Sequence, residues 1–534
     1  MADSEVKPHI SEQYVEGLPV DAAQIATADE HSLTVREALK IYPKAVFWAV
    51  AMSMTIVMEG YDASVINNFY TYPSFEKKYG TYYPGLGYQI STPWQTGLSL
   101  GAIVGAFFAL LANGYLTERF GHRKVIMVAL VIMTGIVFMQ FFAPSIEVLQ
   151  AADVLVGLPW GIFSIMGPTY ASEVCPLALR GYLTSYVNLC WVIGGFIGAG
   201  VLQGLVNNTT EWSYRIPFAI QWVWPLPLFL LAYFAPDSPY WLVRNGRVAD
   251  AEQSMQRLSS GLSQQDIRNS VALIIHTNEL EKQMNTESSF RDCFRSTNLR
   301  RSEIACMSLC AQSFSGQVFA SSTYFLVQAG FNASEAYKMN FGSTGVAFVF
   351  TCVSWVLMTY VGRRTLFISG MIGLTLVLLV IGVLSYPVSD ASRWAQGGLC
   401  FVWLAIYSAT MGPQSFSIAA EISATRLRAQ TISLARNSYY LVAIVANVIE
   451  PLLINPTSAN LKGKTAFVWM ATSLLTVVWA VLRLPETRGR TYEDLDLLFE
   501  RRLPAWKFSI IDMNTIRMEH DASNERDTGK TGSC

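Results

Sequence analysis

The sequence predicts an all-α membrane protein with twelve transmembrane helices in two pseudo-symmetric lobes of six. Three observations support this fold class: long apolar segments, an uneven distribution of basic residues, and short motifs that recur in both halves. Of the 534 residues, 52% are hydrophobic and only 14% are charged. Soluble domains carry about a quarter charged residues, so the composition favours a chain embedded in lipid.

A helix needs about twenty apolar residues to cross a hydrocarbon core of about 30 Å. Several of the apolar segments are interrupted by glycine or proline, as is typical where helices line a polar cavity. The predicted helices are 45–70, 94–116, 125–143, 147–171, 182–206, 216–235, 303–329, 336–360, 365–386, 395–420, 429–454 and 465–484.

These segments set the expected domain limits. We expect a cytoplasmic tail at 1–44, a first lobe at 45–235, a cytoplasmic linker at 236–302, a second lobe at 303–484 and a cytoplasmic tail at 485–534. The polar start of the chain does not have the pattern of a cleavable signal peptide, so we expect the first membrane helix to direct insertion.

Basic residues predict the orientation, because the cytoplasmic loops of membrane proteins are enriched in Lys and Arg. With both termini in the cytoplasm, the inner segments hold 29 of the 38 basic residues and the outer loops hold seven. Glycosylation sequons begin at Asn207, Asn208 and Asn332, in loops that this topology places outside. Sequons also arise by chance, so they add modest support.

The two halves share motifs in the same order. Glu173 and Arg180 are seven residues apart, as are Glu421 and Arg428, at an offset of 248 along the chain. Pro236-Asp237-Ser238-Pro239 and Pro485-Glu486-Thr487-Arg488 repeat this relation at an offset of 249. A duplicated six-helix unit predicts two parallel lobes with a site between them, near the middle of the membrane.

Other classes of protein lack support in the sequence. The eight cysteines include no CxxC pair, and the five histidines show no metal-ligand spacing. We find no nucleophile–base pair and no phosphate-binding loop, so we expect neither an enzyme nor a cofactor. The net charge of −1 gives no sign of a nucleic-acid partner.

Charged residues within membrane helices are costly and mark candidate functional sites. They are Glu59 and Asp62 in the first helix, Asp153 in the fourth, and Arg436 and Glu450 in the eleventh. Glu59 and Asp62 are three residues apart and therefore share a helix face. Two carboxylates on one apolar face cannot both ionise at low cost, so we expect one to exchange a proton near working pH. The alternative is that either one is a helix-end residue bonded to backbone.

Several motifs resemble those of the sugar porters of the major facilitator superfamily, over about 40–500. The resemblance is greatest to the fungal α-glucoside (maltose-type) permeases. The motifs are Gly114–Lys124 (GYLTERFGHRK), Pro236–Leu242, Gly412-Pro413 with Glu421 and Arg428, Pro485–Arg490, Met58–Asp62, Tyr170–Arg180, Thr184–Tyr186 and Asn188–Trp191.

The resemblance implies proton coupling through the first helix. The Gly-Tyr-Asp triplet that ends at Asp62 carries the proton-binding Asp in proton-coupled sugar porters, so we expect Asp62 to carry the proton and Glu59 to modulate it. Three positions depart from the relatives: Asp153 replaces an Arg that pairs with the helix 1 Asp in many of them, Ala102 replaces an acidic residue, and Gly195 replaces a Gln. Because Arg436 lies near the inner end of its helix, a direct pair with Asp62 is not expected.

Sugar recognition requires amide and hydroxyl groups for the ring hydroxyls and aromatic rings for the apolar faces. The candidates are Asn188, Gln312, Tyr324, Phe416 and Asn437. The resemblance points to Asn188 and Phe416, and Gln312 stands in a Gln-x-x-x-Gly pattern that ends at Gly316. Each of the amides is equally compatible with bonding between helices, and Phe416 with a lipid-facing position.

A second group of charges lies at the predicted cytoplasmic helix ends. We expect it to form networks that hold the inner side closed and break as that side opens. The group consists of Glu118, Arg119, Arg123, Glu173, Arg180, Arg363, Arg364, Glu421 and Arg428. Topology alone explains the basic members, but acidic residues contribute little to topology.

The sequence therefore predicts a secondary active transporter in the plasma membrane. It would import a sugar, such as the α-glucoside maltose, by proton symport with alternating access, and would work as a monomer. A facilitative hexose uniporter or an exporter of another polar metabolite are alternatives in the same fold. A sugar sensor without transport is less favoured, since only about fifty residues follow the last predicted helix.

Overall fold

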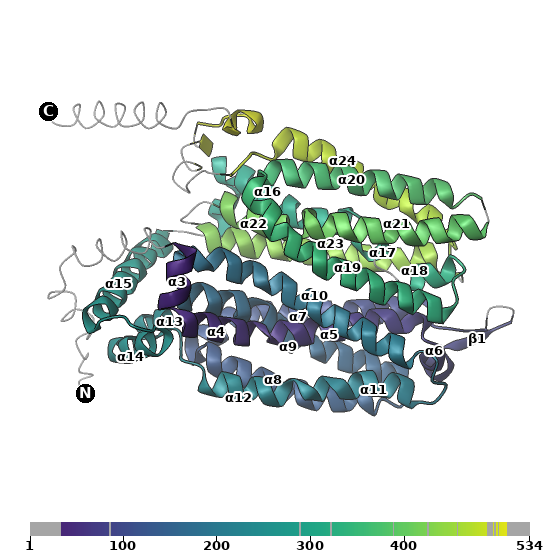
Figure 1. Cartoon of the computed structure of the whole chain (residues 1–534), viewed down its shortest axis with the longest axis horizontal. Coiled ribbons are helices and arrows are strands. Elements are labelled where there is room, and N and C mark those ends of the chain that lie inside the picture. Colours follow the sequence, from purple (N-terminus) through teal and green to yellow (C-terminus); the bar gives the residue numbers. More distant parts are fainter. Residues whose placement is uncertain are drawn as a thin grey trace, which may run out of the picture.

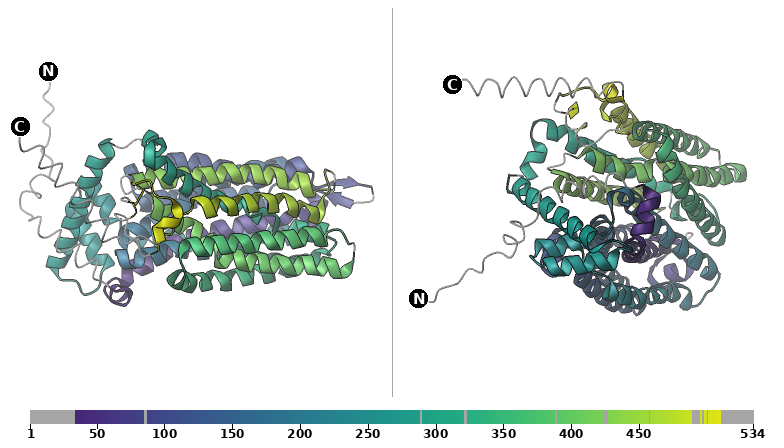
Figure 2. Two further views of the ribbon diagram at one scale, coloured as in Figure 1. Left: turned by 90° about the horizontal axis from the view of Figure 1, so that it is seen from above. Right: turned by 60° about the vertical axis from the view of Figure 1, so that its left-hand side comes forward.

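The computed structural model describes residues 34–84, 87–287, 290–320, 323–387, 389–423, 427–456, 458–488, 495, 498–499 and 501–509. The predicted tails 1–44 and 485–534 are thus described only in part. Two helical bundles lie side by side, and the second bundle, in green and yellow, lies above the first in Figure 1. The helices of both bundles run along one common direction (Figure 2).

The first lobe is built from the six membrane helices expected at 45–235. The first of them combines α4, α5 and η1, and the sixth combines α11, η2 and α12. Its elements are α4 (Pro43–Ser53), α5 (Thr55–Asn68), η1 (Phe69–Thr71), α7 (Thr92–Phe120), α8 (His122–Phe141), α9 (Ile146–Val174), α10 (Leu177–Leu205), α11 (Trp212–Ile220), η2 (Gln221–Val223) and α12 (Pro225–Phe234).

The second lobe repeats this arrangement with two helices that are visibly interrupted. Its elements are α16 (Ser296–Phe314), α17 (Gln317–Ala320), α18 (Thr323–Gln328), α19 (Ala333–Tyr360), α20 (Arg363–Leu384), α21 (Asp390–Ala409), α22 (Met411–Ile422), α23 (Arg428–Ile454), η5 (Lys462–Thr465) and α24 (Ala466–Arg483). The lobes meet where α10 packs against α19 and α7 packs against α23.

Short elements cover the two ends of the bundles (Figure 1). The end predicted to be cytoplasmic carries α3 (Val35–Ile41), α13 (Pro239–Arg244), α14 (Val248–Leu258), α15 (Gln264–Glu287), η3 (Phe290–Phe294) and η6 (Ala505–Ser509). The opposite end carries α6 (Pro73–Tyr79) and an antiparallel hairpin of β1 (Thr81–Tyr83) and β2 (Gly87–Gln89), in which Thr81 pairs with Gln89.

Ten helices in the described part of the chain are long and apolar enough to cross a membrane. The two other predicted spans, 303–329 and 395–420, are present as broken helices rather than continuous ones. The first is interrupted at Gly316, whose φ of 82° favours glycine, and the second at Thr410, the residue between α21 and α22. The twelve-helix fold in two lobes is confirmed.

Glycines allow unusually close helix contacts inside the first lobe. A Cβ atom added to Gly105 of α7 would lie 2.1 Å from the carbonyl oxygen of Val154, and one added to Gly157 of α9 would lie 2.2 Å from that of Ala102. Small residues are common at such membrane interfaces because they let two backbones approach. The packing of α7 on α9 therefore depends on these two positions.

Replacing Gly157 by Val is expected to lower the yield of folded protein severalfold. The added side chain would meet backbone atoms, which cannot move aside as a flexible side chain can, and overpacking typically costs about 1–3 kcal/mol. Gly135→Val is the matched control, because a Cβ at Gly135 of α8 would meet nothing within 4 Å. Size-exclusion chromatography of tagged protein measures the yield; equal yields for the two variants would contradict the packing argument.

Candidate functional site

Hydrogen bonds that join the two lobes gather at the end that carries α6 and the hairpin. Asn68 of α5 is their centre: its side-chain oxygen accepts hydrogen bonds from the Thr323 hydroxyl and, at 3.4 Å, from the Asn340 amide. The Tyr337 hydroxyl donates to the Asn68 carbonyl. These contacts hold the lobes together on the predicted outer side, so the structure is closed there.

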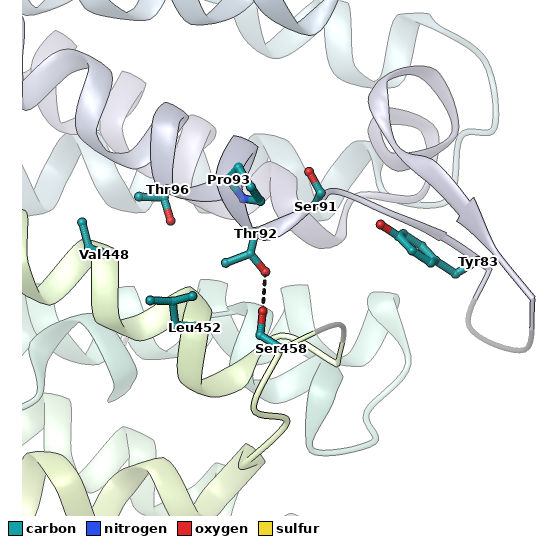
Figure 3. A pocket seen from close by; sticks show the side chains of 8 residues that line it. All are labelled: Tyr83, Ser91, Thr92, Pro93, Thr96, Val448, Leu452 and Ser458. Atoms are coloured by element: carbon teal, nitrogen blue, oxygen red, sulfur yellow. Dashed lines mark hydrogen bonds between the residues drawn. The ribbon is translucent and has the colours of Figure 1, made fainter.

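A shallow pocket at the same end lies between α7 and α23 (Figure 3). The hydroxyls of Thr92 and Ser458 form a hydrogen bond of 2.9 Å across it, between the lobes. Its other lining residues are Tyr83, Ser91, Pro93, Thr96, Val448 and Leu452. Only hydroxyl and apolar groups line this pocket, so it does not offer the amide and charged groups that lie around Arg436 deeper in the lobe interface.

Glu76 adds a titratable group to this outer closure. It lies on α6, near Tyr324 and Tyr337 of the second lobe, and its Oε1 atom is buried with no hydrogen-bond partner among the described residues. Burial raises the pKa of the Glu76 carboxyl from its ordinary value of 4.5 to about 8. Protonation of Glu76 therefore stabilises the closed arrangement, and this stabilisation is lost as the pH rises from about 4.5 to about 8.

We expect the outer side to open more readily at alkaline than at acidic external pH. Labelling of a Ser458→Cys variant by a membrane-impermeant maleimide measures the opening, and the unmodified protein corrects for native cysteines. The rate of labelling should rise between about pH 4.5 and 8 after correction for thiol ionisation. Adding Glu76→Gln should remove that rise. A rise that persists in the double variant would assign the pH dependence to another group.

Arg436 occupies a cage of aromatic rings in the second lobe. Its guanidinium carbon lies 5.4 Å from the ring centroid of Phe416, 5.3 Å from that of Tyr439 and 5.2 Å from that of Tyr440. Cation–π attraction at such distances holds the guanidinium among the rings. Tyr407 of α21 is a further neighbour of this cation.

Glu59 of the first lobe faces that cage. It is 7% exposed and interacts electrostatically with Arg436, and Trp191 of α10 lies near its carboxylate. Among the residues that the structure describes, the Oε2 atom of Glu59 has no hydrogen-bond partner. An acid of one lobe and a base of the other thus interact electrostatically across the lobe interface, and no direct ion pair joins them in the described part of the chain.

Asp62 points elsewhere, into the interior of the first lobe. It is fully buried, and its Oδ1 atom accepts a hydrogen bond of 2.6 Å from the side-chain amide of Gln221 in η2. Asp153 of α9 is its electrostatic neighbour. Glu59 and Asp62 thus have different neighbours, and the expectation that Asp62 carries a proton and Glu59 modulates it stays a prediction.

The predicted sugar-binding residues fall into two groups. Asn188 and Asn437 are half-buried on α10 and α23, and Phe416 is 41% exposed beside Arg436. Gln312 is buried, and its amide donates a hydrogen bond of 3.1 Å to the carbonyl of Gly412, just after the break between α21 and α22. Tyr324 is separate from them, since it belongs to the outer closure beside Glu76 and Gln95.

Four aromatic residues around the central charges were not among the predicted site residues. They are Trp191, Tyr407, Tyr439 and Tyr440. Nothing in the sequence distinguishes them from lipid-facing aromatics, but the charge at Arg436 could have pointed to Tyr439 and Tyr440. A residue three or four positions further along a helix lies over the same face.

The cytoplasmic charges form two clusters, one in each lobe. Glu173 accepts a hydrogen bond from Ser238 and lies 3.7 Å from both His122 and Arg244. Glu421 accepts a hydrogen bond of 2.5 Å from Thr487 and lies 3.3 Å from Arg363. The sequence repeat therefore has a structural meaning, because Ser238 and Thr487 bind the two equivalent glutamates.

Both clusters connect each lobe to the segment that follows it, rather than connecting one lobe to the other. The other members of the predicted network behave differently. Arg119 donates to the Tyr115 hydroxyl at 2.6 Å, Arg123 lies over the ring of Tyr233, and Arg364 donates to the Val481 carbonyl at 2.8 Å. Glu118 is exposed, and the side chains of Arg180 and Arg428 lie outside the described part.

The three sequon asparagines are exposed, two in the segment between α10 and α11 and one directly before α19. Asn208 accepts a hydrogen bond of 2.7 Å from the hydroxyl of Thr210 in its own sequon. Asn332 caps α19 by accepting from the Glu335 backbone N–H at 2.9 Å. Glycosylation at Asn207, Asn208 and Asn332 stays a prediction.

Solved structures support the same fold. The proton:xylose symporter XylE bound to 6-bromo-6-deoxy-D-glucose superposes with a TM-score of 0.68 at 18% identity, covering 86% of this chain and 100% of that chain. The xylose transporter XylE from E. coli in a partially occluded inward-open conformation gives a TM-score of 0.67 at 18% identity, covering 84% and 99%. At this identity the likeness shows the fold alone.

Sequence relatives are much closer. A general alpha-glucoside permease of Saccharomyces cerevisiae is 35% identical over 523 residues, which are 96% of this chain and 85% of the relative. The maltose permease MAL31 of the same species is 36% identical over 494 residues, covering 91% and 80%. Residues 48–499 match the family described as sugar (and other) transporter. The chain is therefore a multi-pass membrane protein that belongs to the sugar (and other) transporter family and has the fold of the major facilitator transporters.

Proposed function

We propose that the protein imports an α-glucoside such as maltose across the plasma membrane, as a monomer, by proton symport with alternating access. The observation that carries this proposal is the approach of Glu59 to the caged Arg436 across the lobe interface. Relatives named as α-glucoside and maltose permeases, at 35% and 36% identity, support the substrate class.

The interface offers both kinds of contact that a sugar requires. Trp191 and Phe416 are each 41% exposed next to the central charges, so their rings border open space and could stack on apolar sugar faces. Asn188 and Asn437 could bond the ring hydroxyls. In this arrangement a disaccharide would lie between Glu59 and Arg436 and contact both lobes.

Binding at that interface would couple sugar to lobe movement. The hydrogen bonds around Asn68 and between Thr92 and Ser458 hold the outer side closed. Opening that side requires all of them to break while the contacts within each lobe persist, which is a rigid-body motion of one lobe against the other. Asp62, buried within the first lobe, would take up and release the coupled proton.

A facilitative hexose uniporter, or an exporter in the same fold, is the second candidate. The observation that favours it is Asp153, an acid beside Asp62 where a base would stabilise the ionised carrier. Uptake of labelled maltose and labelled glucose in transporter-deficient cells separates the candidates. Maltose accumulation that a protonophore abolishes supports the symporter, whereas glucose equilibration that is insensitive to the protonophore contradicts it.

Gln312→Ala is expected to weaken sugar binding by roughly five- to a hundredfold. Without the Gln312 amide, a sugar hydroxyl would be buried without a hydrogen-bond partner, which typically costs about 1–3 kcal/mol of binding free energy. Ser308→Ala is the matched control, because Ser308 bonds the same helix, α22, through the Ser415 carbonyl at 3.3 Å. A raised half-saturation constant for Gln312→Ala alone, at normal surface expression, places Gln312 in the site; equal effects of the two variants would make it a packing residue.

A further inference from the structure

Glu450 is a buried acid that the proposed transport cycle does not use. It lies near the end of α23 and is 5% exposed. Its Oε2 atom accepts a hydrogen bond of 2.7 Å from the indole N–H of Trp469 in α24. An acidic residue inside a membrane helix is costly and marks a candidate functional position. The contacts of Trp469 show what this hydrogen bond holds in place.

Trp469 packs against the break in the seventh membrane helix, between α16 and α17. Gly316 stands at this break with a φ of 82°. A Cβ atom added to Gly316 would lie 2.9 Å from the Cβ atom of Trp469 and 3.3 Å from Cδ1 of Leu378 in α20. Trp469 is 4% exposed, so it is enclosed between the glycine and its other neighbours. The hydrogen bond to Glu450 therefore fixes the orientation of an indole that lies directly against the break.

The same helix, α24, also binds the backbone at this break. The hydroxyl of Thr472 donates a hydrogen bond of 2.8 Å to the carbonyl of Phe314, the last residue of α16. The last carbonyls of a helix have no partner within that helix, so this hydroxyl supplies one from outside. One apolar and one polar contact from α24 thus hold the two parts of the seventh helix at a fixed angle.

The angle at the break matters because functional contacts lie on both sides of it. Gln312, one turn before Gly316, donates a hydrogen bond of 3.1 Å to the Gly412 carbonyl and is a predicted sugar-binding residue. Thr323, at the start of α18, donates to the Asn68 side chain of the first lobe in the outer closure. A change of angle at Gly316 would displace the predicted sugar-binding amide relative to the residues that close the outer side.

We propose that Glu450 is a positioning residue, which acts through Trp469 to fix the angle at the break between α16 and α17. The proposal deepens the proposed function and rests on it for the role of this angle in sugar binding. With the hydrogen bond in place, α17 and α18 move as one body with the rest of the second lobe, so the outer side opens only when the lobes move apart. Without it, the indole can rotate, and α17 and α18 can leave the closure by themselves.

Labelling of an Ala320→Cys variant by a membrane-impermeant maleimide tests the proposal without sugar or a proton gradient. Ala320 ends α17 and is 7% exposed, so a thiol there is shielded until this segment moves. Adding Glu450→Ala should raise the labelling rate about fivefold or more, because a buried hydrogen bond to a charged group is lost. Adding Glu450→Gln should leave the rate unchanged, since Gln keeps an oxygen that can accept from the indole. Protein without the added cysteine corrects for native thiols.

Two further variants show whether Glu450 acts through the indole. Trp469→Phe removes the N–H donor and should raise the rate as Glu450→Ala does, and the two substitutions together should raise it no further. Ser473→Ala is the matched control, because the Ser473 hydroxyl pairs with that of Thr375 at 2.7 Å between α24 and α20. This control should leave the labelling rate unchanged. The half-saturation constant for sugar should rise in the same variants in which labelling becomes faster.

Three results would overturn the positioning role. One is an unchanged labelling rate in Glu450→Ala. Another is a Glu450→Gln variant that labels as fast as Glu450→Ala, which means that the charge matters, as it would at a site that binds a proton or a cation. A third is an equal effect of Ser473→Ala, which means that any lost contact of α24 is enough. Trp469→Phe carries the test if Glu450→Ala does not fold. If labelling behaves as expected but neither maltose nor glucose is transported, the positioning role stands and the proposed function fails.

Discussion

Asp62→Asn is expected to abolish accumulation of sugar while sparing exchange. The substitution keeps the shape of the side chain and an oxygen that can accept the hydrogen bond from Gln221. Asn cannot bind and release a proton, however, so the empty carrier would lose the step that links its return to the proton gradient. Exchange needs only the loaded carrier to reorient, and it should therefore persist.

Uptake into proteoliposomes against an imposed pH gradient measures this effect. Concentrative uptake should fall to the level of passive equilibration, a loss of at least about tenfold, which corresponds to about 1.4 kcal/mol. Glu59→Gln is the informative comparison: it should shift the pH optimum without abolishing accumulation. If Asp62→Asn still accumulates sugar and Glu59→Gln does not, the two roles are reversed. If neither changes accumulation, the uniporter becomes the better description.

Arg436→Leu is expected to reduce transport about a hundredfold. The substitution removes the cation and leaves Glu59 in a buried interface with no opposite charge. Breaking a buried ion pair costs about 3–5 kcal/mol because the remaining charge is uncompensated, and the cost here should lie at the lower end of that range because Glu59 and Arg436 are neighbours without direct contact. The aromatic rings of Phe416, Tyr439 and Tyr440 would lose the guanidinium that lies among them.

A double-mutant cycle tests whether the loss comes from the charge pair. Adding Glu59→Gln to Arg436→Leu removes the uncompensated charge, so the double variant should transport better than Arg436→Leu alone. Arg393→Leu is the control for loss of an arginine, since Arg393 pairs with Asp390 at 3.0 Å in an ion pair whose acid is 88% exposed. Exposed pairs contribute about 0–1 kcal/mol. A double variant no better than the single would show that Glu59 and Arg436 act independently.

The sequence alone was sufficient for the twelve helices, the two lobes and the family. Apolar length and glycine or proline content are properties of short segments, and they decide where a chain can cross a bilayer whatever it packs against. The motifs that repeat in the two halves are also short, so they can be found without knowing what they contact. Glu173 and Glu421 recur at an offset of 248, and in the structure both bind a hydroxyl from the segment after their lobe.

The partners of the intramembrane charges required the tertiary structure. Glu59 and Asp62 are three residues apart, which places them about 60° apart around a helix, and this spacing suggested a single acidic pair. That angle was enough for them to face different surroundings. Glu59 has Arg436, 377 residues away in sequence, as its electrostatic neighbour, and Asp62 has Asp153, 91 residues away. Which side chain lies beside a buried carboxylate depends on how α5 packs against α9 and on how the two lobes meet, and no local pattern of residues contains that information.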